Sequence, residues 1–277
     1  MNSVLRLDQH DKTLAQLTSS GWVLLREECS TRPQFDELLG KFLSKVTFDP
    51  ARSAASNKTQ MVDSGSDPIG LHIENGNTPL PPDIIAFHCV SAAKRGSQTT
   101  VCDGQQLWSQ LPVRLRTLFA NPITVRRTLD CAIWKRYVAT ALGRVDHELI
   151  TAQDLHHFLK QVPGQTGVLR KDGSLDYILT INAVRTDNML GVKAFANALM
   201  GPSFNYEKPT YCASDGTLIE PQLIDEISQL AQALVHDISW ANGDVLLIDN
   251  KRVMHGRRAI IGPSEERVIN IGMGTRL

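Results

Sequence analysis

The sequence lacks the features that mark several large classes of protein. Its five cysteines are odd in number and show no CxxC spacing, so a disulfide framework or a zinc ribbon is not expected. No apolar run approaches the ~18 residues that a transmembrane helix needs, and residues 1–8 lack the apolar core of a signal peptide. We therefore expect a cytoplasmic protein with reduced thiols, in which Cys89 and Cys102 are buried.

An excess of charge of either sign is also missing. The chain has 29 basic and 29 acidic residues, and no block of like charge interrupts it. A nucleic acid or an anionic membrane is therefore not expected as a partner. The 277 residues are enough to bury a substantial core. Since there are no internal repeats or obvious linkers, we expect a single domain over residues 1–277.

What the sequence does contain is a set of metal-ligand candidates. His72 and Glu74 are two residues apart, and His255 lies far downstream. Side chains at i and i+2 of an extended strand project to the same face. His72 and Glu74 can therefore point into one cavity, to which a distant strand adds His255. Two imidazoles and one carboxylate, with coordination positions left open, are the ligand set of non-haem Fe(II) oxygenases. The simpler alternative is a strand-edge pair that forms ordinary surface hydrogen bonds.

Hydrophobic periodicity and turn residues predict a strand-rich protein with interspersed helices. Residues 49–69 are rich in Ser, Asp, Asn and Pro, which is typical of a lid or binding loop. Strands are predicted at residues 21–25, 83–90, 97–102, 236–240, 245–248 and 267–272, and a hairpin at 168–179. Helices are predicted at residues 31–42, 105–119 (weakened by Pro112), 151–159, 193–200 and 221–234. This pattern favours an α+β fold, with a jelly-roll core (a double-stranded β-helix) and flanking helices.

Four segments together resemble the taurine dioxygenase/TfdA-like (TauD/TfdA) superfamily of Fe(II)- and 2-oxoglutarate-dependent oxygenases. Most of the superfamily has Asp in the short motif, and Glu74 instead resembles the clavaminate-synthase-like branch and several amino-acid hydroxylases. The four segments are His72-x-Glu74; Gly96-Ser97-Gln98-Thr99-Thr100 with Asp103-Gly104; Gly243-Asp244 followed by Asp249-Asn250 and His255-Gly256-Arg257; and Arg267, 12 residues beyond His255.

The resemblance implies that His72, Glu74 and His255 bind Fe(II), and that 2-oxoglutarate and O2 are cosubstrates. It also implies that Thr99 binds one carboxylate of 2-oxoglutarate and that Arg267 pairs with the distal one, as a guanidinium can engage both carboxylate oxygens. Arg267 could instead form an ion pair with Glu265 or Asp244. Of Thr99 and Thr100, only one can face the site, because the side-chain period of a strand is two.

The resemblance further implies oxidation of an unactivated C–H bond in an amino acid or an amino-acid-derived small molecule. Three residues are candidate substrate contacts: Asn75, which lies beside the iron ligands, and Arg257 and Arg258, one of which could bind a substrate carboxylate. The alternative for both arginines is a solvated face. Hydroxylation is the default outcome, with desaturation or cyclisation open, and the substrate could be free or tethered to a carrier protein in specialised metabolism. A sulfonate or another small carboxylic acid is an alternative substrate. Two other classes of protein stay open: a non-catalytic jelly-roll module that senses a small ligand or metal, and a metal-dependent hydrolase or isomerase on a cupin-like barrel.

Overall fold

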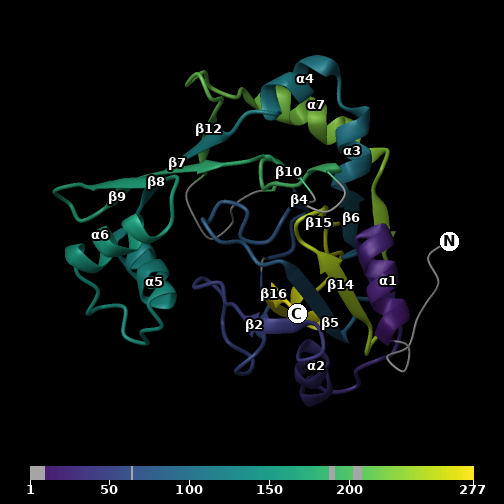
Figure 1. The fold of residues 1–277 in the computed structure, drawn as a ribbon. Coiled ribbons are helices and arrows are strands. Elements are labelled where there is room, and N and C mark those ends of the chain that lie inside the picture. The colour runs from purple at the N-terminus through teal and green to yellow at the C-terminus, as the bar shows by residue number, and fades with distance from the viewer. Residues whose placement is uncertain (1–9, 64, 187–190, 202–207) are drawn as a thin grey trace.

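The computed structural model describes residues 10–63, 65–186, 191–201 and 208–277. Figure 1 shows strands at the centre and helices around them. In chain order the elements are α1 (His10–Ser20), β1 (Trp22–Leu25), α2 (Arg32–Leu39), β2 (Leu43–Val46), β3 (Gln60–Met61), β4 (Ile69–His72), β5 (Ile84–Ser91), β6 (Thr99–Asp103), α3 (Gly104–Gln110), α4 (Val113–Phe119), β7 (Ile123–Leu129), α5 (Cys131–Ala141), α6 (Ala152–Gln161), β8 (Gln165–Leu169), β9 (Leu175–Ile181), β10 (Val184–Thr186), β11 (Lys193–Phe195), β12 (Thr210–Cys212), α7 (Pro221–Gln232), β13 (His236–Ile238), β14 (Val245–Asp249), β15 (Val253–Arg257), η2 (Ser264–Glu266) and β16 (Val268–Arg276).

Two antiparallel sheets carry the residues on which the site depends. The larger sheet has the strand order β1-β14-β5-β16-β2, with β3 also paired to β16, and the smaller has the order β13-β6-β15-β4. One cluster of buried apolar side chains includes Phe87 and Ile271 from the larger sheet and Val101 and Val253 from the smaller. The two sheets therefore share one apolar core.

Helices α1 and α2 cover the other face of the larger sheet (Figure 1). Their side chains Leu17, Phe35 and Leu39 share a cluster with Ala86 and Leu247 of that sheet. Because successive residues of β5 alternate between the two faces, this strand is buried on both sides, and residues 84–89 are buried without a break.

A third sheet, of order β12-β7-β9-β8, extends beside helices α5 and α6 (Figure 1). Inward-facing Val125 and Leu129 of β7 share the largest apolar cluster with Trp134 of α5 and Leu155 of α6. All strand pairs between the described elements are antiparallel. The molecule is thus a mixed α/β protein with antiparallel sheets.

Most of the predicted strands and helices are confirmed, with two corrections. The helix predicted over residues 105–119 is two helices, because Pro112 cannot continue α3 and instead forms the N-cap of α4. The helix predicted at 193–200 is wrong, since Lys193–Phe195 form β11 against β10. Periodicity alone does not distinguish a helix from a strand in a short apolar run. Helices α1 and α5 and strand β7 were not predicted.

Cys89 and Cys102 are fully buried, as expected. All five cysteines are free. None of the helices that the structure describes has the length and apolar character needed to cross a lipid bilayer.

Candidate active site

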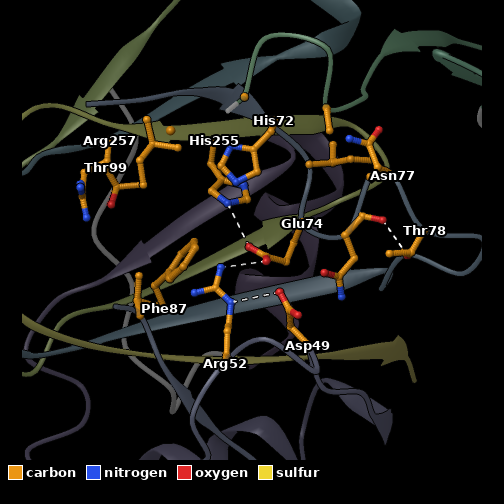
Figure 2. A pocket seen from close by; sticks show the side chains of 18 of the residues that line it. Asp49, Arg52, His72, Glu74, Asn77, Thr78, Phe87, Thr99, His255 and Arg257 are labelled. Atoms are coloured by element: carbon orange, nitrogen blue, oxygen red, sulfur yellow. Dashed lines mark hydrogen bonds and ion pairs between the residues drawn. The ribbon is translucent and has the colours of Figure 1, made fainter. Parts of the chain in front are cut away.

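The three predicted metal ligands meet at one point (Figure 2). His72 ends β4 and lies directly opposite His255 of β15 in the register, with 4.4 Å between the ring centroids. Glu74 lies two residues further on, in the turn after β4 rather than in the strand that was predicted to carry both side chains. One ligand atom from each of the three side chains lies within 4.8 Å of the other two. Two imidazoles and a carboxylate at this spacing could hold a metal ion.

The imidazole of His72 is oriented by the backbone on one side and by a glycine on the other. Its Nδ1 lies 2.9 Å from the carbonyl oxygen of Gly70, to which it donates a hydrogen bond, so that Nε2 keeps its lone pair for a metal. Burial, and then the charge of His255, lowers the pKa of His72 to about 4, so the ring is neutral. A Cβ atom at Gly201 would lie 2.5 Å from the Cβ of His72, so a larger residue there would displace the imidazole.

The backbone of Glu74 is held by Asn250, which follows β14. The Oδ1 of Asn250 accepts from the backbone N–H of Glu74 at 2.8 Å, and its Nδ2 donates to the Glu74 carbonyl at 3.1 Å. This contact explains why Asn250 belongs to the same motif as His255. Asn250 holds the backbone of Glu74, and His255 lies beside its carboxylate.

The carboxylate of Glu74 presents its two oxygens to different partners. Oε1 accepts a hydrogen bond from Nη2 of Arg52 at 2.9 Å (Figure 2). Oε2 is buried, has no hydrogen-bond partner among the described residues and lies 3.5 Å from Nε2 of His255. Burial opposes ionisation, but Arg52 and the two histidines together lower the pKa of Glu74. An ionised, buried oxygen that faces two imidazoles matches the donor set of a divalent iron site.

Arg52 was not predicted as a site residue. It comes from the segment 49–69, whose composition predicted a lid or binding loop but did not single out any side chain. Its Nε lies 3.7 Å from Oδ2 of Asp49, which also lines the cavity. The loop thus contributes an ion pair to the carboxylate of Glu74, a candidate metal ligand.

Arg267 lies between η2 and β16, where it lines the same cavity and is 8% exposed. In the part of the chain that the structure describes, no carboxylate forms an ion pair with it. Asp244, one alternative partner, instead pairs with Arg26 at 2.6 Å. Burial, and then the charge of Arg257, lowers the pKa of Arg267 to about 10, so it is still cationic at neutral pH. Such a buried cation suits an anionic ligand.

Thr99, rather than Thr100, lines the cavity. Thr99 lies opposite Arg257 in the pairing of β6 with β15. Its Oγ1 accepts a hydrogen bond from Nε1 of Trp240 at 3.0 Å, which leaves the hydroxyl proton available for a bound anion. Trp240 was not predicted as a site residue, because it lies well before the His255 motif and carries no local signal.

The three predicted substrate-binding residues are not all at the site. Asn75 and Arg257 line the cavity. Nη2 of Arg257 also donates to the carbonyl oxygens of Gly65 and Asp67, at 2.7 and 2.6 Å. Arg258 is not among the lining residues, and its Nε pairs with Oδ1 of Asp237 at 3.0 Å on the surface.

Two further lining residues, Arg127 of β7 and Tyr137 of α5, were not predicted. They come from elements that the sequence patterns did not reveal. Together with the ligands above, they enclose a cavity of about 140 Å3, which we call the metal cavity.

Comparison with protein families identifies the chain. The model of the family described as taurine catabolism dioxygenase TauD, TfdA family matches residues 2–273. The chain therefore belongs to the TauD/TfdA family. It is a 2-oxoglutarate-dependent dioxygenase that uses Fe(II), 2-oxoglutarate and O2. The sensing module and the cupin-like hydrolase or isomerase are thereby set aside.

Solved structures share the fold at low sequence identity. A taurine dioxygenase from Burkholderia xenovorans has a TM-score of 0.60 and 12% identity, and the match covers 99% of this chain and 82% of that one. AAD-2 in complex with Mn(II) and N-oxalylglycine has a TM-score of 0.59 and 12% identity, over 99% and 89%. PvcB from Pseudomonas aeruginosa has a TM-score of 0.58 and 14% identity, over 95% and 79%. Comparison of the sequence with curated proteins finds no match.

Proposed function

We propose that this enzyme oxidises an unactivated C–H bond of an amino acid or an amino-acid-derived small molecule, with Fe(II) held by His72, Glu74 and His255. The observation that carries the proposal is the buried Oε2 of Glu74, which has no hydrogen-bond partner among the described residues and lies 3.5 Å from Nε2 of His255, in the cavity that Arg267 also lines. Hydroxylation is the default outcome, and desaturation or cyclisation needs only a different position of the substrate radical.

Thr99 and Arg267 are proposed to bind 2-oxoglutarate. The Arg267 guanidinium pairs with the distal carboxylate, and the Thr99 hydroxyl, oriented by Trp240, donates to a carboxylate oxygen. Bound Fe(II), with 2-oxoglutarate and O2, supplies the oxidising power. Phe87, whose ring stands edge-on to His255 with 5.2 Å between centroids, keeps water from that side of the ligands.

Two features of the chain support an amino acid or an amino-acid-derived molecule as the substrate. Glu74 in place of Asp resembles amino-acid hydroxylases of the superfamily, and Asn75 and Arg257 line the cavity as polar contacts. The excess of arginine in the lining also favours the alternative of a sulfonate or another small carboxylic acid. A carrier-tethered amino acid and a role in specialised metabolism stay part of the proposal.

We also propose that residues 1–277 form a single domain whose two facing sheets make a double-stranded β-helix. The shared apolar core of the two sheets and the antiparallel pairing of β4 and β15 support this arrangement. A cytoplasmic location is supported by the five unpaired cysteines, four of which are buried.

The test is anaerobic addition of Fe(II) and 2-oxoglutarate to the apoprotein, followed by visible absorption. We expect a weak charge-transfer band that requires both additions and is lost in His255→Ala. His157→Ala, which removes an exposed imidazole from α6, is the matched control and should keep the band. Absence of the band in folded wild-type protein with saturating iron would refute the assignment of the ligands.

A further inference from the structure

Glu74 reaches the metal cavity from a turn whose backbone has an uncommon conformation. β4 ends at His72, and residues 74–77 form a turn that we call the ligand turn. Asn75, the residue after Glu74, has a φ of 54°, in the left-handed region. A residue with a Cβ atom enters this region at a cost, and asparagine is one of the few that tolerate it.

We propose that Asn75 is a positioning residue of the metal site. Its left-handed backbone conformation, rather than its side chain, places the carboxylate of Glu74 beside His72 and His255. This inference rests on the proposed role of Glu74 as an Fe(II) ligand. It is separate from the substrate contact proposed for the side-chain amide of Asn75.

The chain is held on the N-terminal side of Asn75. Ile73 is 1% exposed, and its N–H donates to the carbonyl oxygen of Asn197 at 2.9 Å. Asn250 binds both the N–H and the carbonyl group of Glu74, at 2.8 and 3.1 Å. The two residues that precede Asn75 are therefore fixed by three backbone hydrogen bonds to distant segments.

The chain is also held on the C-terminal side. The carbonyl oxygen of Asn75 accepts from the N–H of Thr78 at 3.0 Å and from its hydroxyl at 2.8 Å. A Cβ atom at Gly76 would lie 2.7 Å from Cγ1 of Ile73 and 2.9 Å from Cβ of Ala198, so the ligand turn is closely packed there. Because both sides are held, a change of φ at position 75 must displace one of them, and one side carries the carboxylate of Glu74.

The side chain of Asn75 contributes little to holding the ligand turn. Within the described structure its amide makes one hydrogen bond, a long one from Nδ2 to Sδ of Met273 at 3.9 Å. A thioether sulfur is a weak acceptor. Position 75 therefore requires a residue that adopts a positive φ, as glycine and asparagine do. Alanine would shift the turn toward a negative φ and move Glu74, and metal binding would have to reverse that shift.

Two substitutions that differ by one methyl group test the inference. Asn75→Gly and Asn75→Ala both remove the side-chain amide, but only glycine adopts a positive φ freely. The apoprotein of each variant is titrated with Mn(II), followed by electron paramagnetic resonance of the free ion, and its Tm is measured. We expect Asn75→Gly to bind Mn(II) nearly as tightly as wild type. Asn75→Ala should bind roughly 5- to 30-fold more weakly than Asn75→Gly, the factor that corresponds to the cost of a left-handed conformation.

Glu27 provides the matched control. It has a φ of 51°, is exposed and is not among the residues that line the metal cavity. Glu27→Gly and Glu27→Ala should differ in Tm but bind Mn(II) alike, because their backbone change is remote from the ligands.

Two results would overturn the inference while leaving the proposed function intact. Equal losses of Mn(II) affinity in Asn75→Gly and Asn75→Ala would assign the effect to the side-chain amide. Unchanged affinity in both variants, with a lower Tm in Asn75→Ala alone, would make the ligand turn a purely structural feature. Failure of the folded wild-type protein to bind Mn(II) would instead refute the proposed function and this inference with it.

Discussion

Arg52 gives the site an arrangement that the ligand residues alone would not have. By donating to Oε1 of Glu74 it occupies one carboxylate oxygen and leaves Oε2 facing His255. A carboxylate constrained in this way can offer a metal only one oxygen, so more coordination positions stay open for reactants. The ion pair with Asp49 in turn restrains Arg52.

The first prediction concerns removal of this constraint. Arg52→Met should weaken metal binding roughly tenfold, near the lower end of the effect seen when partners of metal ligands are removed. The measurement is a titration of the apoprotein with Mn(II), followed by electron paramagnetic resonance of the free ion. Arg32→Met is the control, because Arg32 donates to the carbonyl oxygen of Ala55 in the same region but does not touch Glu74. An unchanged Mn(II) affinity in Arg52→Met would assign Arg52 a different role.

The second prediction concerns Arg267 and the binding of 2-oxoglutarate. Truncating one partner of a buried charge pair costs about 2–4 kcal/mol, so Arg267→Met should raise the dissociation constant of 2-oxoglutarate roughly 30- to 800-fold. Titration of the visible band with 2-oxoglutarate measures it. Arg276→Met, an exposed substitution at the far end of β16, should leave the constant unchanged. If Arg267→Met binds 2-oxoglutarate normally, Arg257 becomes the better assignment for the distal carboxylate.

At the scale of elements, the contact between α2 and the larger sheet contains a buried titratable group. His88 of β5 is 1% exposed and stacks on Phe35 of α2, with 5.0 Å between ring centroids. Its Nε2 lies 2.8 Å from the carbonyl oxygen of Cys29, to which it donates. Burial lowers the pKa of His88 below its ordinary value of 6.5, which the hydrogen bond to Cys29 opposes only in part.

This contact predicts a loss of stability in acid. The unfolded chain binds the His88 proton more readily than the folded protein does, so protonation favours unfolding. The stabilising contribution is complete above about pH 6.5 and decreases as the pH falls below that value. Thermal unfolding of the apoprotein from pH 7.5 to 5 should show a smaller decrease in His88→Gln than in wild type. His156→Gln, which changes an exposed histidine of α6, should follow the wild type, and the same behaviour in His88→Gln would refute the prediction.

At the scale of the whole molecule, the site depends on how the smaller sheet brings β4 beside β15. The two strands lie far apart in the chain, and their pairing places His72 opposite His255. Arg267 comes from the residue just before β16 and Arg52 from a loop, so these two residues and the two strands bring four separate segments to one cavity. A ligand that contacts all four segments can bind only the folded state, so its binding should stabilise that state.

Thermal unfolding with and without ligands tests this coupling. Mn(II) and 2-oxoglutarate are each added at about 100 times the dissociation constant. Each ligand should then add roughly 2.7 kcal/mol to the free energy of unfolding. That corresponds to an increase in Tm of several degrees for a chain of this size. The double variant His72→Ala/His255→Ala should show no increase from Mn(II). An increase equal to that of wild type would locate the stabilising metal elsewhere.

The sequence predicted the parts of this protein that depend on local chemistry. Periodicity identified β5, β6, β14 and β16, because runs of buried apolar residues are a local signal. The His72-x-Glu74 spacing and the order of the motifs along the chain indicated the candidate ligand set and the family, although Glu74 lies in the turn after β4 and not in a strand. Local patterns failed for α5 and for Lys193–Phe195, where packing of the helix and the pairing of β11 with β10 outweigh weak local preferences.

Only the tertiary structure decided which charged side chains share the cavity. Arg257 and Arg258 are neighbours in sequence, yet one lines the metal cavity and the other pairs with Asp237 on the surface. Arg52 and Arg127 carry no motif, and they reach the site because a loop and a sheet fold over it. The candidate metal ligands can therefore be read from the sequence, because such a site needs particular residue types in recognisable motifs. The substrate contacts are not, since they depend on side chains that distant segments bring together.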